Sequence, residues 1–197
     1  MNRNSQKRIY GDNIYFITCA VHDKIEFFKE SQLCELWIQE IKLCKELKQF
    51  LLIAFCLIYD HFHLLIKPNN EIANYSKIMH FLKRNFSQNA NKILGYVRLN
   101  DEGDNAPEGD NAHCLQWQIK MDNFVIQTRN KFLEKHGKYH NLPKFKWQKS
   151  FHDHIIRNQK DLANHWNYTM NNFLKHGLPE NWQYTGLNYP ELIDEID

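Results

Sequence analysis

The sequence has no apolar run long enough to cross a bilayer, which takes about 20 consecutive apolar residues. Its longest such run, FLLIAFCLIY at residues 50–59, suits a buried strand instead. The opening residues, MNRNSQKRIYGDN, also lack the apolar segment of a signal peptide. We therefore expect a cytoplasmic protein that does not associate with membranes.

The sequence also has no pair of cysteines in a C-x-x-C pattern. Its cysteines are five in number, which leaves one unpaired in any disulfide framework. Four of them lie in apolar contexts, as reduced intracellular thiols do. We expect neither disulfides nor a zinc knuckle from Cys19, Cys34, Cys44, Cys56 and Cys114.

Net charge is low, at +2 over 197 residues, but its distribution is uneven. Residues 101–110 and 189–197 together hold nine acids and no base, so the remaining residues carry +11. A basic body with acidic appendages is compatible with a nucleic-acid partner, although an ordinary charged surface gives the same numbers. With 43% hydrophobic and 14% aromatic residues, the chain has the composition of a single globular domain.

The order of the predicted elements indicates the fold class. Hydrophobic periodicity predicts strands at 13–21, 50–59, 61–68 and 144–157, and helices at 31–48, 72–94, 114–137 and 158–177. Strand, helix, hairpin, helix, strand is the split βαβ pattern. We predict an α+β, ferredoxin-like fold with an antiparallel sheet, helices on one face, and the third strand at or next to the centre.

The third strand contains the H-x-H motif of LIYDHFHLLIK (57–67). Because strand residues alternate between faces, His61 and His63 share one face and Phe62 lies on the other. Two imidazoles so placed can hold one divalent metal ion. They can equally be two polar residues near a strand end, and the motif alone does not decide between these readings.

The last helix has two distinct faces when residues 161–174 are projected at about 100° each. The predicted core stripe consists of Leu162, Trp166, Met170 and Phe173. Tyr168 lies on the opposite, polar side, with Asn172 one turn later and His165 and Asp161 earlier. Tyr168 is therefore either a functional tyrosine or a solvent-exposed one.

Together, the H-x-H strand and the late Tyr-x-x-x-Asn helix resemble the HUH single-tyrosine transposases of the IS200/IS605 type. The closer resemblance is to the REP-associated tyrosine transposases. Three segments carry it: YDHFHLL (59–65), WQKSFHDHIIRN (147–158) and YTMNNFLKHG (168–177). It covers residues 8 to about 100 and 144 to about 185. Two family prolines are missing, since Tyr59 precedes the H-x-H and Phe173 follows Asn172.

The resemblance implies metal-dependent cleavage and rejoining of single-stranded DNA hairpins through a 5′-phosphotyrosine, by a monomer or homodimer. Tyr168 matches the nucleophile, and His61, His63 and Asn172 match the ligands of Mg²⁺ or Mn²⁺. His154 and His165 would support the site. The expected DNA-contacting residues are Lys83, Arg84, Trp147, Lys149, Arg157 and Lys175, and for each a plain surface or core role is equally open.

The chain length favours one domain over residues 1–197, and the composition indicates an acidic tail at about 178–197. The resemblance implies an insertion at about 100–143. The tail is aromatic enough to pack against the body. Three alternatives remain: a domesticated hairpin DNA- or RNA-binding protein without turnover, a metal-dependent hydrolase with an incidental tyrosine, and a structural protein. The hydrolase lacks further acidic or histidine ligands at suitable spacing, and the structural protein leaves both motifs unexplained.

Overall fold

The computed structural model describes residues 13–99 and 112–196. Its centre is a four-stranded antiparallel sheet in the order β2-β3-β1-β4. The strands are β1 (Tyr15–Ala20), β2 (Leu51–Ile58), β3 (His61–Lys67) and β4 (His152–Ile155). The H-x-H strand β3 is an inner strand, as predicted, and forms a tight hairpin with β2.

Over residues 13–99 and 112–196 the chain also has five α-helices, and it is an α+β protein. They are α1 (Ser31–Lys48), α2 (Tyr75–Ile93), α3 (Ala112–His136), α4 (Gln159–Met170) and α5 (Asn172–Lys175). The order β1-α1-β2-β3-α2-α3-β4-α4 contains the split βαβ pattern, with α3 added before β4. In the described part of the chain, no helix combines the length and the apolarity that a bilayer crossing needs.

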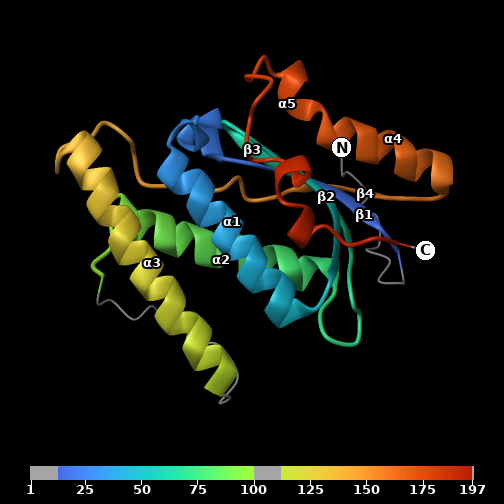
Figure 1. Ribbon diagram of the computed structural model, residues 1–197, viewed down its shortest axis with the longest axis horizontal. Helices are drawn as coiled ribbons and strands as arrows, with labels where there is room; N and C mark the ends of the chain where they lie inside the picture. Colours follow the sequence, from blue (N-terminus) through green and yellow to red (C-terminus); the bar gives the residue numbers. More distant parts are fainter. Residues whose placement is uncertain (1–12, 100–111, 197) are drawn as a thin grey trace, which may run out of the picture.

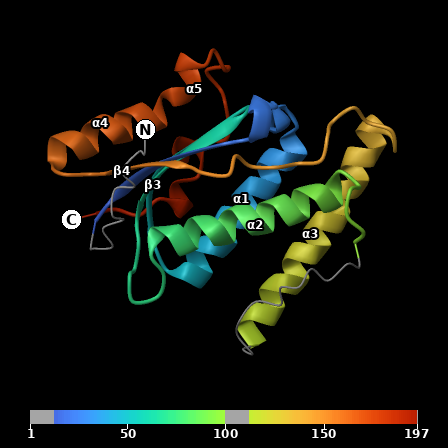
Figure 2. The same cartoon turned by 180° about the vertical axis from the view of Figure 1, so that it is seen from behind.

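Helices cover both faces of the sheet, which corrects the prediction of helices on one face. Figures 1 and 2 show α1 and α2 on one side of the sheet and α4 and α5 on the other. The inner strands are apolar on both faces: Ile17 and Leu64 pack toward α1 and α2, whereas Phe16 and Leu65 pack toward α4. A sheet with two apolar faces needs two covering layers.

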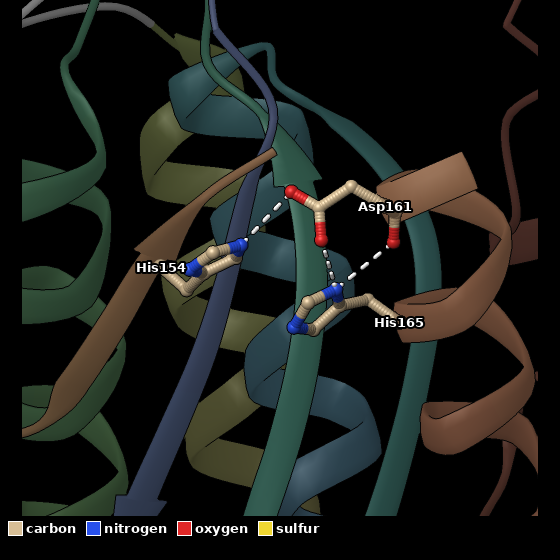
Figure 3. A group of neighbouring side chains, drawn as sticks. All are labelled: His154, Asp161 and His165. Atoms are coloured by element: carbon tan, nitrogen blue, oxygen red, sulfur yellow. Dashed lines mark hydrogen bonds and ion pairs between the residues drawn. The ribbon is translucent and has the colours of Figure 1, made fainter. Parts of the chain in front are cut away.

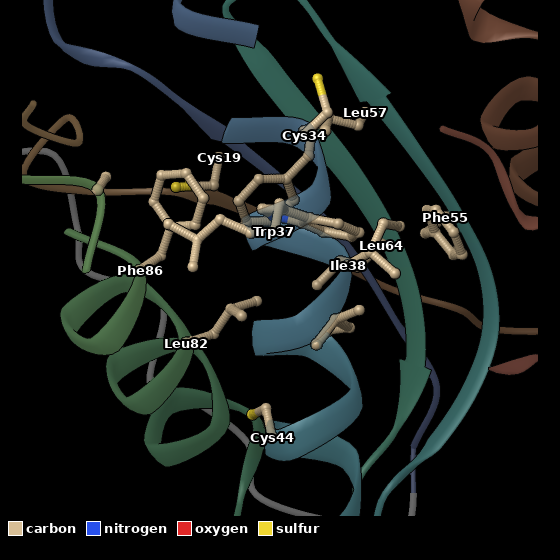
Figure 4. Packing of buried hydrophobic residues seen from close by; sticks show 14 of the residues in the cluster. Cys19, Cys34, Trp37, Ile38, Cys44, Phe55, Leu57, Leu64, Leu82 and Phe86 are labelled. Carbon is tan, nitrogen blue, oxygen red and sulfur yellow. The ribbon is translucent and has the colours of Figure 1, made fainter. Parts of the chain in front are cut away.

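The larger core lies between the sheet and the α1–α2 layer. Figure 4 shows Trp37 of α1 and Phe86 of α2 packed among apolar side chains near the sheet. The ring of Trp37 stacks at a tilt on Phe62, the residue between the two histidines, with ring centroids 5.3 Å apart. Each fully buried side chain of this size contributes roughly 1.5–3 kcal/mol, so this face firmly anchors β3.

Helix α3 packs across α1 and α2, and Phe132 and Val125 join their core (Figure 1). It falls within the predicted insertion at about 100–143. That this segment is an insertion stays a prediction, and the acidic residues 101–110 lie outside the described residues.

The C-terminal tail folds back along β2, the outermost strand on one side. The Trp182 indole donates to the Leu57 carbonyl at 2.7 Å, and the Leu57 amide donates to the Tyr184 carbonyl at 2.9 Å. Further on, Asp194 accepts from the Leu52 amide at 2.7 Å and pairs with Lys45 at 2.9 Å. The tail therefore covers a sheet edge that would otherwise be open to other strands.

The predicted helix 158–177 is two helices, broken at Asn171. The side-chain amide of Asn171 donates to the Asn167 carbonyl at 3.0 Å, and such local bonds compete with helix continuation. The predicted core stripe is partly wrong as well. Met170 and Phe173 are buried, but Trp166 is 38% exposed, while Thr169 and Asn172 face the protein interior.

Glu40 on α1 is a buried carboxyl group with a single hydrogen bond, from the Asn89 amide at 2.7 Å. Burial raises its pKa to about 7. Because the folded state holds this proton more tightly, the stability that it contributes is complete below about pH 4.5 and is lost as pH rises through about 7.

We expect Glu40→Gln to flatten this pH dependence. Between pH 4.5 and pH 8, the free energy of unfolding of wild type should fall by on the order of 1–3 kcal/mol more than that of the variant. Urea denaturation across this range measures the difference. Parallel wild-type and variant curves would show that Glu40 is not protonated in the folded protein.

Candidate active site

His61 and His63 project from β3 toward α4, with Phe62 on the other face, as the strand alternation predicts. Both histidines are buried, and their ring centroids lie 4.9 Å apart in an edge-to-face arrangement. They therefore form one side-by-side pair beneath the helix that carries Tyr168.

Each imidazole is oriented by a bond at its Nδ1. The Asp60 carboxylate accepts from His61 Nδ1, and the Thr18 hydroxyl lies 2.8 Å from His63 Nδ1. This arrangement directs the Nε2 atoms toward the shared site, and His63 Nε2 is buried without a hydrogen-bond partner. A histidine held at one nitrogen by a carboxylate or hydroxyl, with the other nitrogen free, is the usual arrangement of a metal ligand.

Burial disfavours the protonated form of both imidazoles. It lowers the pKa of His63 to about 3, with smaller contributions from His61 and His176. Burial likewise lowers the pKa of His61, against the opposing effect of Asp60. Only a neutral imidazole can bind a metal ion, so both shifts favour the form of these histidines that binds metal.

Asn172, the first residue of α5, is brought to the same place. It is 1% exposed and lies beside His63, whose pKa it raises against the larger effect of burial. Neither its Oδ1 nor its Nδ2 completes a hydrogen bond of good geometry. Phe173 and Leu178, which pack on Cys56 and Ile58 of β2, hold α5 in this position.

Tyr168 lies in the last turn of α4, next to this group and in the same chain. Its ring centroid is 5.3 Å from that of His63 and 5.8 Å from that of Phe16. The ammonium group of Lys175 lies 4.4 Å from the centre of the Tyr168 ring. At 36% exposure, the tyrosine remains accessible from outside.

The sequence interpretation missed three residues of this site. Asp60 stands directly before the H-x-H motif, and a carboxylate at that position could have been recognised as a partner of a ligand histidine. Thr18 is located by the register of β1 against β3, which the sequence does not state. His176, between Lys175 and Gly177, has its ring centroid 4.8 Å from that of His61.

A second group lies beside the first. His154 of β4 and Asp161 and His165 of α4 meet as Figure 3 shows, with ligand atoms all within 4.8 Å of one another. The hydrogen bond from His154 lowers the pKa of the Asp161 carboxyl group. These three residues could hold a divalent metal ion. The two histidines were predicted to support the site, but the aspartate between them was not recognised.

The predicted DNA-contacting residues are scattered. Trp147 is only 8% exposed and its indole donates to the Lys83 carbonyl at 3.1 Å, so it packs in the core and offers no stacking surface. Lys83 donates to the Gln148 carbonyl at 2.8 Å. The side chains that remain exposed are Arg84, Lys149, Arg157 and Lys175. Of these, Lys175 lies beside Tyr168.

Comparison with known proteins finds a related sequence. The chain is 26% identical over 198 residues to a candidate REP-associated tyrosine transposase of Haemophilus influenzae (strain ATCC 51907 / DSM 11121 / KW20 / Rd), covering 95% of this chain and 91% of that protein. The chain is a homologue of the REP-associated tyrosine transposases. The resemblance inferred from its motifs is thereby confirmed, although no family model matches the sequence.

The fold also matches a solved structure. That structure is a REP-associated tyrosine transposase bound to a REP hairpin. The match has a TM-score of 0.51 and 18% sequence identity, and it covers 98% of this chain and 89% of the other. It supports the α+β architecture with a four-stranded antiparallel sheet.

Proposed function

We propose that this protein cleaves and rejoins single-stranded hairpin DNA through a covalent 5′-phosphotyrosine on Tyr168, with a divalent metal ion. The observation that carries the proposal is the convergence of Tyr168, His63 and Asn172 from separate elements onto one buried polar site. The kinship with REP-associated tyrosine transposases, one of which has been solved with a REP hairpin, supports hairpin DNA as the substrate.

The residues present fit a metal ion. His63 Nε2 and both polar atoms of Asn172 are buried without hydrogen-bond partners, and such atoms are costly unless a ligand satisfies them. His61, His63 and Asn172 would hold Mg²⁺ or Mn²⁺, and their mixed nitrogen and oxygen donors suit Mn²⁺ well. When bound, the ion would polarise the scissile phosphate as a Lewis acid.

Tyr168 supplies the nucleophile in this proposal. Its phenolic oxygen forms a bond to phosphorus as it loses its proton, the bond from phosphorus to the 3′ oxygen breaks, and that oxygen leaves as a 3′-hydroxyl. Because the phosphotyrosine conserves the ester bond, a 3′-hydroxyl can later attack it, release Tyr168 and rejoin DNA without ATP. The Lys175 ammonium is close enough to stabilise negative charge on the phenolate and phosphate.

The exposed basic residues would hold the DNA backbone by phosphate contacts. Lys175 adjoins Tyr168, and Arg157 lies just before α4, so both are on the side of the sheet that carries the site. Arg84 lies on α2, which covers the opposite face. We therefore assign the scissile strand to Lys175 and Arg157, and more distant hairpin contacts to Lys83, Arg84 and Lys149.

The adduct assay tests this function. We incubate a REP-type hairpin oligonucleotide, labelled at one end at a time, with the protein and Mn²⁺. A 5′ label should appear on a shortened free fragment, and a 3′ label should appear on an SDS-stable protein adduct. An adduct with the label 3′ of the cut supports a 5′-phosphotyrosine. Hairpin binding without cleavage of either oligonucleotide would instead favour a domesticated binding protein.

We also expect each site to act within one chain, because Tyr168 and His63 of the same chain already adjoin. An equimolar mixture of Tyr168→Phe and His63→Ala proteins should therefore show no more cleavage than either variant alone. Restored cleavage in the mixture would show that the tyrosine helix serves a second subunit. Co-expression of the two variants controls for slow exchange between preformed dimers.

A further inference from the structure

We propose that His154, Asp161 and His165 form a second metal site, which binds Zn²⁺ or a similar transition-metal ion. The bound ion would link α4, the helix that carries Tyr168, to the edge strand β4. This site is separate from the one assigned to His61, His63 and Asn172. The proposal concerns metal binding alone and does not rest on the proposed DNA chemistry.

The three side chains come from two elements. His154 lies on β4, opposite Phe16 in the strand register, and Asp161 and His165 are one turn apart on α4. His154 Nε2 is 2.9 Å from one carboxylate oxygen of Asp161, and His165 Nδ1 is 3.0 Å from the other. The two imidazole rings are stacked, with centroids 4.6 Å apart and an interplanar angle of 17° (Figure 3).

These separations fit a common coordination sphere. Two ligands bound at roughly 2.1 Å to one ion, with the angles of octahedral or tetrahedral coordination, lie about 3.0–3.4 Å apart. The nitrogen–oxygen separations of 2.9 and 3.0 Å are already close to these values, and all three ligand atoms lie within 4.8 Å of one another.

The donor set indicates the class of metal. Two imidazole nitrogens and one carboxylate oxygen form a borderline set that favours Zn²⁺ and similar transition metals over Mg²⁺. The side chains are one-fifth to one-third exposed, so an ion can reach them and water can complete its coordination. Asp161 is itself held in place, because it also accepts from the Arg157 amide at 3.0 Å.

The ring of Phe16 contacts both groups. Its centroid lies 4.8 Å from that of His165 and 5.4 Å from that of His63. An ion on the second site would not share ligands with the first. By linking β4 to α4, it would limit movement of the helix whose next turn carries Tyr168.

The test is Zn²⁺ binding to the full chain after chelator treatment, measured by equilibrium dialysis and elemental analysis. We expect a His61→Ala/His63→Ala variant to retain one bound Zn²⁺, and addition of His154→Ala/His165→Ala to abolish it. The matched control is His152→Ala added to the His61→Ala/His63→Ala variant, because His152 lies on the same strand two residues before His154. It should keep the ion.

A gentler variant guards against misfolding. Asp161→Asn keeps the shape of the side chain but removes its charge, and it should lower Zn²⁺ affinity at this site by at least tenfold. Thermal melts without metal establish that this variant is folded. Undiminished Zn²⁺ binding by both the Asp161→Asn protein and the double-alanine protein would overturn the proposal, as would the absence of Zn²⁺ binding in the His61→Ala/His63→Ala background.

Discussion

Replacing Tyr168 by Phe should abolish DNA cleavage, by at least about 10³-fold, because it removes the one oxygen that attacks phosphorus in the proposed reaction. Hairpin affinity should hardly change, since the ring that contacts Phe16 and His63 is kept. The measurements are single-turnover cleavage of a labelled hairpin and the equilibrium dissociation constant of the same hairpin.

The matched control for this variant is Tyr139→Phe. Tyr139 is 97% exposed and follows α3, which packs against the layer on the other side of the sheet. It loses the same oxygen at a distant position, so its cleavage rate should equal that of wild type. If the Tyr168→Phe protein cleaved at the wild-type rate, Tyr168 would not be the nucleophile.

Replacing His63 by Ala should have an effect of similar size on cleavage, through loss of the metal ion. His63 Nε2 is buried without a hydrogen-bond partner and is therefore available to bind the metal ion. Removing it leaves only His61 and Asn172 as protein ligands. We expect Mn²⁺ affinity to fall by more than about 100-fold, beyond what loss of an outer-shell partner costs. Electron paramagnetic resonance of free Mn²⁺ measures this without any cleavage reaction.

Thr18→Val provides the graded comparison. It keeps the shape of Thr18 but removes the hydroxyl that lies 2.8 Å from His63 Nδ1. Loss of such an outer-shell partner costs metal affinity about 10–100-fold, so this variant should lie between wild type and His63→Ala. Equal Mn²⁺ affinity in all three proteins would place the metal elsewhere.

The sequence was most informative where side-chain periodicity alone sets the geometry. Alternation along β3 correctly put His61 and His63 on one face, because a strand has a side-chain period of two whatever surrounds it. Hydrophobic periodicity likewise predicted the helix over 72–94, which the structure has as α2, Tyr75–Ile93. The order of the motifs and the family resemblance then indicated Asn172 and Tyr168 as site residues, and the fold brings both beside His63.

The sequence was least informative where several elements must meet. Trp147 was among the expected DNA-contacting residues, with a core role left open, and Phe28, Phe62 and Phe86, from three distant segments, surround its ring. The pairing of Asp161 with His154 likewise depends on how α4 lies on β4. No local pattern encodes such contacts, because they follow from the packing of the whole chain.

The break at Asn171 is an intermediate case. Asparagines at 167, 171 and 172 are weak helix formers, so the sequence contains a signal for interruption. The projection of 161–174 as one continuous helix ignored that signal and placed Trp166 in the core. In the structure α4 ends at Met170, and the new helix turns Asn172 inward.

The most direct test of the account is to locate the covalent bond in the adduct. Wild-type protein would be trapped on a hairpin oligonucleotide with Mn²⁺, digested with nuclease and protease, and analysed by tandem mass spectrometry. The account predicts a nucleotide phosphate on the peptide that contains Tyr168, attached to that tyrosine. A phosphate on any other residue would contradict it, as would cleavage of the hairpin with no protein-bound phosphate at all.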